Sequence, residues 1–305
     1  RAAAEVLKMP WERVDIITGR TDLHLPITSP QDGSNSIFTN TRAFYGAAQD
    51  MLAKIKEIAA NDLGGTADEY DISNERVHQI ADESVGMTFA EVASRAIQLG
   101  GKYTGSADLP EELAEWTQIS VSRLAGTGFM GVFHDSIHEG NPPGFTVSCI
   151  EIELDKETGK YEILDLINVA ESGTIMHPKG MENQLVGGAV WGIGLSGYER
   201  HLYDPQNGMP ASTGYWQSKV PTYLDTPVKI GTGWVDLPDP ENPVGARGVG
   251  EPAQGSVSAA LTAAITDALD GHIFGASPIT ADMIINHVAG TSEDSVPLAQ
   301  NNFRG

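Results

Sequence analysis

The stretch from Phe145 to Gly173 limits the fold of this chain more than any other part of the sequence. It reads "FTVSCIEIELDKETGKYEILDLINVAESG", in which Ile150, Ile152 and Leu154 alternate with acidic side chains. Such alternation is typical of a half-buried strand, and Asp155–Gly159 supplies the residues of a turn. The sequence therefore predicts a β-hairpin that presents one face to a core.

Helical patterns surround this hairpin. Apolar side chains recur at helical spacing over Thr41–Ala60 and Val257–Asp270, and "TFAEVASRAIQLGG" combines a capping box with a glycine stop. A glycine-rich helix is predicted over Met181–Glu199, where the glycines favour close packing against another backbone. Because these elements do not follow the βαβ order of a parallel sheet, the predicted class is α+β, with mixed sheets and packed helices.

Shorter patterns complete the structural prediction. Ala2–Leu7 reads as the end of a helix, "RVDIITG" alternates as a strand, and Asn61–Val85 reads as a turn-rich hairpin. Two α+β subdomains are expected, one over residues 1–130 and one over residues 131–305.

Composition excludes several classes of function. The net charge of −22 argues against a nucleic-acid or anionic-membrane partner, and no run approaches the ~20 apolar residues of a membrane span. The single cysteine, Cys149, excludes an internal disulfide framework and favours a reducing, cytoplasmic compartment. Its place in an apolar alternation predicts a small buried residue rather than a nucleophile.

The familiar motifs of metal and nucleophile chemistry are missing. His134 and His138 are four residues apart, but the glycines and proline around them disfavour a helix, so we predict no metal site. The chain has no GxSxG elbow and no GxxxxGK[ST] phosphate loop.

Two loops of small residues are candidates for chemistry. The first is "DGSNSIFTN", Asp32–Asn40, directly before the predicted Thr41–Ala60 helix. Backbone amides and hydroxyls at a helix entrance form an anion site suited to a phosphate or pyrophosphate. The same residues suit a turn with an ordinary cap, and the local pattern alone favours that interpretation.

The second loop is "ARGVGEPAQGS", in which Glu251 stands among residues without bulky side chains. If Pro252 begins the following helix, Glu251 lies at the positive end of the helix dipole, which favours its carboxylate form. Gly248 and Gly250 leave room for a large group to approach. On local grounds a dipole-compensating acid is the simpler interpretation, and a proton acceptor is the alternative.

Taken together, these stretches resemble the molybdopterin-binding large subunit of the xanthine oxidase family of molybdenum hydroxylases. "DGSNSIFTNTRAFYGAA" is similar to the family's cofactor loop and following helix, and the 145–173 hairpin to its "VEVDPETGEVRV" segment. "ENQLVGGAVWGIG" resembles "EGQIEGGVVQGLG", "YWQSKVPT" resembles "YKIPT", and "VGARGVGEPA" resembles "FGAKGVGEPP". The matches run in order along nearly the whole chain, as expected for the C-terminal half of such a subunit.

The resemblance implies roles for individual residues. Glu251 matches the active-site base, which takes a proton from a molybdenum-bound hydroxyl or water while a hydride leaves the substrate carbon. The residues that match cofactor-binding positions are Gly33, Ser34, Asn35 and Ser36 in the phosphate loop, Gln184 beside the pterin and Gly250 near the metal. The sequence departs from the family pattern at Trp191, where the family has glutamine, and at Arg247, where it has lysine.

The resemblance also implies partners and cofactors. The family's earlier "GGGFGGK", "RGFG" and "GQGxGT" elements are missing, and the chain opens without an initiator Met. We therefore expect a companion chain that carries the N-terminal half of the molybdenum subunit. The resemblance implies molybdenum-molybdopterin as the cofactor, in its plain or its cytosine dinucleotide form. Because one cysteine cannot ligate iron–sulfur clusters, these clusters and FAD are expected on partner subunits.

The expected activity is oxidation of an electron-poor carbon in a small N-heterocycle or aldehyde, with water as the oxygen source and Glu251 as base. A carbon monoxide dehydrogenase-type member and a non-catalytic scaffold paralogue are the alternatives.

Overall fold

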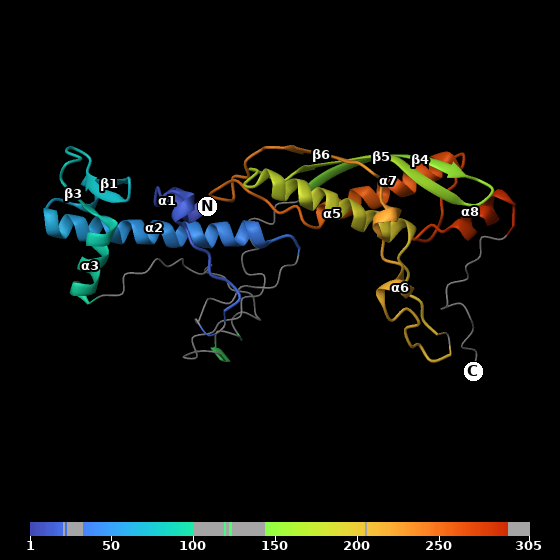
Figure 1. Ribbon diagram of the computed structural model, residues 1–305, viewed down its shortest axis with the longest axis horizontal. Coiled ribbons are helices and arrows are strands. Elements are labelled where there is room, and N and C mark those ends of the chain that lie inside the picture. Colours follow the sequence, from blue (N-terminus) through green and yellow to red (C-terminus); the bar gives the residue numbers. More distant parts are fainter. Residues whose placement is uncertain are drawn as a thin grey trace. The chain divides into compact units, whose positions relative to one another are not determined.

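The computed structural model describes residues 1–20, 22, 33–100, 119, 122–123, 144–204 and 206–291. The chain forms two compact units (Figure 1). The first contains Arg1–Pro142 and Asp239–Ala246, and the second contains Pro143–Pro238 and Arg247–Gly305. The subdomain boundary expected between residues 130 and 131 lies outside the described residues and stays a prediction, as do the expectations for His134 and His138.

The first unit is built around one long helix. That helix is α2 (Ser36–Leu63), which packs against α1 (Ala2–Val6) and α3 (Phe89–Leu99). Beside it lies an antiparallel sheet of three short strands, β1 (Tyr70–Ser73), β2 (Arg76–Gln79) and β3 (Gly86–Thr88). Ile58 of α2, Ile72 of β1 and Val77 of β2 meet in its core.

Two sequence predictions in this unit are confirmed. The turn-rich Asn61–Val85 region contains the β1–β2 hairpin. The capping box at the start of α3 is formed, because the Glu91 amide donates to Thr88 Oγ1 at 3.2 Å and the Thr88 amide donates to the Glu91 carboxylate at 2.7 Å.

The strand predicted for "RVDIITG" is wrong. Arg13 closes the short 3₁₀ turn η1 (Trp11–Arg13), and residues 14–18 have no regular structure. Ile16 and Ile17 are 70% and 59% exposed. An alternating pattern makes a strand only where another strand pairs with it, and no strand formed by the described residues pairs with this segment.

The sheet of the second unit contains the predicted hairpin. Strands β4 (Phe145–Asp155) and β5 (Lys160–Glu171) pair antiparallel around the predicted turn, where Gly159 adopts a positive φ of 65°. Strand β6 (Ile230–Val235), which the sequence analysis did not identify, pairs parallel to β5 and makes the sheet mixed. The α+β class is therefore confirmed.

The prediction that Cys149 is buried is wrong. Along β4 the side chains at odd positions are exposed and those at even positions are partly buried. Cys149 consequently points outward with Val147 and Glu151, while Ile150 and Ile152 pack against the core. Glu151 and Glu153 indicate that the odd-numbered side chains of this strand face solvent. The apolar residues on both sides of Cys149 made this alternation difficult to recognise from the sequence.

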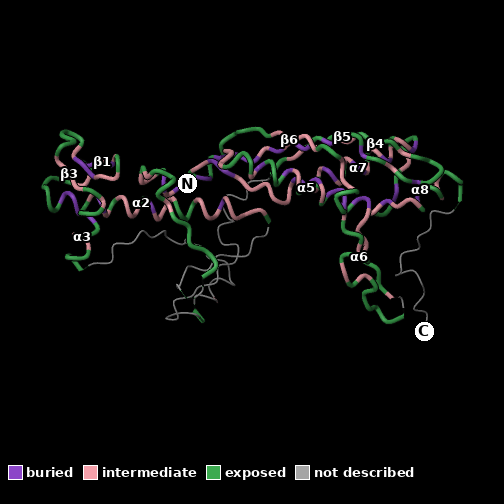
Figure 2. The backbone as a smooth tube through the Cα atoms, viewed as in Figure 1, coloured by how far each residue is buried: buried purple, intermediate pink, exposed green. Residues whose placement is uncertain are grey.

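Two helices pack together beside this sheet. They are α5 (Pro178–Gly197) and α7 (Pro252–Ala268), and Figure 2 shows buried positions concentrated along them and along β5. Helix α8 (Ala281–Val288) completes the core. A short helix α6 (Tyr215–Ser218) and the 3₁₀ turn η5 (Tyr223–Asp225) follow α5 in the sequence, and α6 is drawn away from α5 and α7 in Figure 1. None of the helices formed by the described residues combines the length and apolar character that a membrane span needs.

Glycines bring α5 and α7 into backbone contact, as the sequence predicted. A methyl group added at Gly188 would lie 2.6 Å from the Ala253 side chain, and one added at Gly192 would lie 2.6 Å from the carbonyl oxygen of Gln254. Both distances are shorter than any ordinary carbon contact. By contrast, Gly187 on the same helix faces open space.

We therefore expect opposite effects from the same substitution at two positions of α5. Gly192→Ala should lower the free energy of unfolding by about 1–3 kcal/mol because it forces the helices apart. Gly187→Ala should raise it by up to about 1 kcal/mol because alanine favours helix. Urea denaturation measures both, and equal effects at the two positions would contradict the close helix contact.

Candidate cofactor site

The first predicted loop lies at the start of α2. Gly33 and Ser34 adopt positive φ angles of 56° and 59°, Asn35 is the N-cap, and Ser36 opens the helix. The Asn35 side chain makes no capping hydrogen bond to the helix. The Asn35 side-chain cap that the simpler interpretation would provide is therefore not formed.

The predicted extent of this loop is wrong in its second half. Residues Ser36–Asn40 belong to α2, which begins five positions before the predicted Thr41. Phe38 is 2% exposed, so its burial favours helix at the loop's end. The Thr39 hydroxyl also donates to the Asn35 carbonyl at 3.1 Å, one turn back along the helix. The part outside the helix is Gly33–Asn35, since Asp32 lies outside the described residues.

A later segment of the chain supports this helix start. Asn242 is 5% exposed, and its Nδ2 donates to the Phe38 carbonyl at 3.0 Å and to Thr41 Oγ1 at 3.0 Å. Its Oδ1 accepts a hydrogen bond from the Val244 amide at 3.0 Å. Asn242 thus joins the Asp239–Ala246 segment to the first turns of α2, a role that the sequence analysis missed.

The second predicted loop lies at the start of α7. Pro252 is the first helical residue and Glu251 is the N-cap, as expected. The Glu251 side chain makes no capping hydrogen bond to its own helix. Glu251 and the preceding Gly248 and Gly250 are partly buried, so the carboxylate lies at the positive end of the helix dipole in a region with little side-chain bulk.

An ion pair ties this loop to the sheet. The Arg247 guanidinium donates to the Glu171 carboxylate at the end of β5, and the two side chains are only 13% and 19% exposed. The Arg247 amide donates to the Ser172 carbonyl at 2.8 Å, and the other Glu171 oxygen accepts from the Gly173 amide at 2.9 Å. Arginine at this position therefore has a partner that its planar guanidinium suits.

Asn168 links the two helices of the second unit. It is fully buried on β5, and its Nδ2 donates to the Leu185 carbonyl at 3.0 Å and to the Ala253 carbonyl at 3.3 Å. Its Oδ1 accepts from Ser148 Oγ at 3.0 Å. Leu185 follows the exposed Gln184, and Ala253 lies two residues after Glu251. One buried amide therefore holds the backbone at both predicted site residues.

The structure divides the predicted residues between the two units. Gln184, Gly250 and Glu251 belong to the second unit, where Asn168 connects their segments; the first unit holds Gly33, Ser34, Asn35 and Ser36. The sequence analysis did not identify Asn168. A polar residue at a position of a strand that alternates with exposed ones, and so faces the core, indicates a buried hydrogen-bonding role. The residues that the structure describes contain no group of three or more His, Cys, Asp or Glu side chains placed to hold a metal ion.

Comparison with known proteins places these features in a family. A family model described as "Molybdopterin cofactor-binding domain" matches residues 1–227. The chain is 26% identical over 95% of its length to the 6-hydroxypseudooxynicotine dehydrogenase complex subunit gamma of Paenarthrobacter nicotinovorans, and covers 34% of that protein. It is 25% identical over 94% of its length to the aldehyde oxidoreductase molybdenum-binding subunit PaoC of Escherichia coli (strain K12), again covering 34%.

A solved structure has the same fold. The reconstituted CO dehydrogenase from Oligotropha carboxidovorans matches 95% of this chain and 33% of its own chain, with a TM-score of 0.69 and 22% identity. The fold of this chain is thus shared with that enzyme. The chain belongs to this family, whose members here include molybdenum-binding subunits, and it spans about a third of the length of these relatives. The family predicted from the sequence motifs is confirmed.

The role of Asn168 is testable by its removal. Asn168→Ala leaves two buried carbonyls and the Ser148 hydroxyl without this partner, so it should lower the free energy of unfolding by about 1–3 kcal/mol. Asn183→Ala, at an exposed position on α5, should change it by less than about 0.5 kcal/mol. Urea denaturation distinguishes the two, and a neutral Asn168→Ala variant would show that Asn168 does not hold the helices.

Proposed function

We propose that this chain is the C-terminal part of a molybdenum-cofactor subunit of an oxidoreductase, and that Glu251 is its catalytic base. The proposed reaction oxidises an electron-poor carbon of an N-heterocycle or aldehyde, with water as the source of oxygen. The observation that carries the proposal is the Glu251 carboxylate, which lies at a helix N-terminus without capping that helix.

The residues present fit a bulky anionic cofactor that brings its own metal. The start of α2, which the Asn35 side chain does not cap, would present backbone amides and a favourable dipole to a phosphate or pyrophosphate. Gln184 has an exposed amide that can hydrogen-bond a pterin. A metal held by an organic ligand needs no protein cluster, which is consistent with the absence of a His, Cys, Asp and Glu cluster among the described residues.

When bound, the molybdenum cofactor would supply the site that accepts electrons from the substrate. Glu251 would accept the proton released by the water that becomes the product's oxygen, and would hold it on a carboxylate oxygen until solvent removes it. Gly248 and Gly250 would let the cofactor approach the backbone. Asn168 and the Arg247–Glu171 pair would keep the carboxylate in one position, which lowers the cost of reaching the reactive geometry.

The remaining parts of such an enzyme are proposed on other polypeptide segments. The chain spans about a third of its relatives' length, which supports a companion that carries the N-terminal part of the molybdenum subunit. Iron–sulfur clusters and FAD would lie on partner subunits, since the chain has one cysteine. The cytosine dinucleotide form of the cofactor and a cytoplasmic location belong to the same proposal.

The base assignment predicts the behaviour of one isosteric variant. Glu251→Gln should reduce kcat by about 10²–10⁴-fold, because an amide cannot accept the proton, while molybdenum content stays unchanged. Glu241→Gln, at an exposed position in the preceding segment, should keep full turnover. Steady-state kinetics and elemental analysis of the assembled complex measure both quantities. Undiminished turnover in Glu251→Gln would refute the assignment.

The phosphate-site assignment predicts a charge effect at Ser36. Ser36→Asp places a negative charge at the helix entrance and should lower bound pterin by about tenfold, through repulsion of the cofactor's phosphate. Ser36→Ala keeps the backbone amides and should retain most of the cofactor. Pterin content, measured by fluorescence after release and oxidation, reports the result. Equal retention in the two variants would place the phosphate elsewhere.

A further inference from the structure

One segment of the second unit presents large apolar side chains to solvent. It is Tyr215–Val228, here called the aromatic arm, which contains α6 and η5. Figure 1 shows α6 drawn clear of α5 and α7. Trp216 is 90% exposed, Tyr223 is 98% exposed and Leu224 is 96% exposed. Soluble chains seldom expose so much aromatic surface in one short segment without a binding role.

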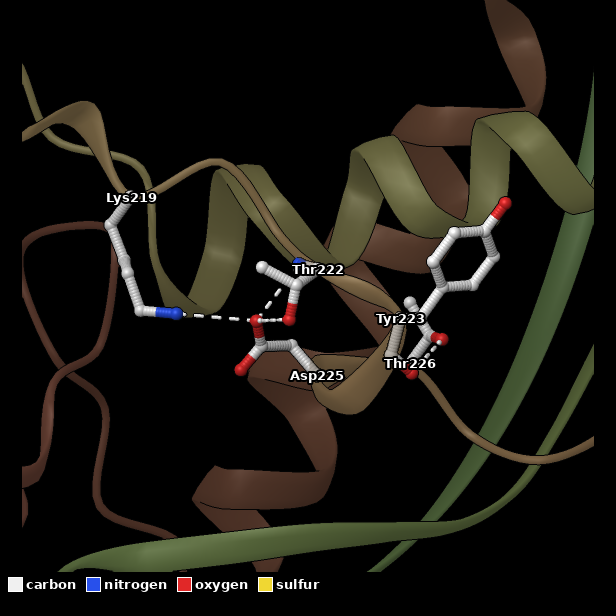
Figure 3. A network of polar contacts seen from close by, with 5 residues as sticks. All are labelled: Lys219, Thr222, Tyr223, Asp225 and Thr226. Atoms are coloured by element: carbon white, nitrogen blue, oxygen red, sulfur yellow. Dashed lines mark hydrogen bonds and ion pairs between the residues drawn. The ribbon is translucent and has the colours of Figure 1, made fainter. Parts of the chain in front are cut away.

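The arm is exposed although its backbone is well held. The Asp225 carboxylate accepts hydrogen bonds from the Thr222 amide at 2.8 Å and the Thr222 hydroxyl at 2.7 Å, and pairs with Lys219 Nζ at 3.2 Å (Figure 3). These contacts, the Thr222 amide first, hold the pKa of Asp225 below its usual range. In Figure 3 the Tyr223 ring points away from this network. The aromatic groups are therefore presented on an ordered support, which lowers the entropy lost on binding.

The arm also differs from the rest of the chain in charge. Its sequence, "YWQSKVPTYLDTPV", contains one cation and one anion, Lys219 and Asp225, and these pair with each other. The whole chain has a net charge of −22. A locally neutral, aromatic segment in so acidic a protein matches the core of a protein interface, where charged residues are depleted and tryptophan and tyrosine are enriched.

A hollow lies between the arm and the body of the second unit. Its volume is about 580 Å³, and its lining includes Tyr161, Tyr198, Lys219, Leu224 and Ile279. Lys219 Nζ lies 5.0 Å from the centre of the Tyr198 ring, so the arm is braced across the hollow. Such a braced cavity beside exposed aromatic groups can accept a side chain from a partner.

We propose that the aromatic arm is the docking surface for the remaining part of the molybdenum subunit. The family match runs to residue 227 and so includes nearly all of the arm, while the chain covers 34% of the two curated relatives. Relatives that contain the same domain therefore carry about twice as much additional polypeptide. This occupant rests on the proposed function, since it is the companion expected there.

Hydroxyl-radical footprinting tests burial of the arm directly. Tyr223 should oxidise rapidly in this chain alone. In the assembled complex, its oxidation rate should fall close to that of Tyr70, a fully buried tyrosine of the same chain. Rapid oxidation of Tyr223 in the complex would overturn the proposal. The proposal would also be overturned if Tyr223 became protected in the chain alone as the protein concentration rose, because a second copy of the chain would then be the occupant.

A matched pair of double variants tests whether the arm contributes affinity. Trp216→Ser with Tyr223→Ser should raise the Kd for the companion by about 30-fold or more, as loss of interface hot spots does. Ile97→Ser with Ile273→Ser removes side chains that are 81% and 77% exposed elsewhere, and should leave the Kd unchanged. An unchanged urea midpoint confirms folding in both. Equal Kd values would overturn the proposal, and neither readout depends on turnover by Glu251.

Discussion

The close approach of α5 and α7 determines what the second unit can do. Because Gly188 and Gly192 contribute no side chains at the contact, Ala253 and Gln254 at the start of α7 lie directly on α5. A single buried amide, that of Asn168, then reaches carbonyls of both helices. If either glycine carried a side chain, these carbonyls would separate, and the segments with Gln184 and Glu251 would lose their common anchor.

Helix starts, glycines and a small number of buried polar contacts position the residues proposed for the site. Glu251 is placed by the helix start, by the adjacent glycines and by the Arg247–Glu171 pair. The start of α2, the proposed anion site, is held by Asn242, whose Nδ2 donates to the Phe38 carbonyl. Buried, hydrogen-bonded asparagines thus have matching roles in both units, each fixing a helix N-terminus.

Local sequence patterns correctly predicted the elements whose structure is determined by residues that are neighbours in the sequence. The β4–β5 hairpin, the α3 capping box and Pro252 at the start of α7 follow from alternation, capping and proline geometry. The failures depend on distant partners: Ile16 and Ile17 pair with no strand among the residues that the structure describes, and β6 is defined by its pairing with β5. Asn242 acts on residues far away in the sequence, so its role required the structure. Glu251 and the phosphate loop emerged from resemblance rather than from local physics.

The contact between Asn242 and Phe38 spans 204 positions of the sequence. A chain made from its N-terminus therefore completes α2 long before the ribosome adds the residue that anchors the helix start. Until residue 246 has emerged, the first unit lacks part of its own structure, and the amides at Gly33–Ser36 lack that support. The start of α7 at Pro252 is made only a few residues later, so the two helix starts proposed for the site become complete at nearly the same stage of synthesis.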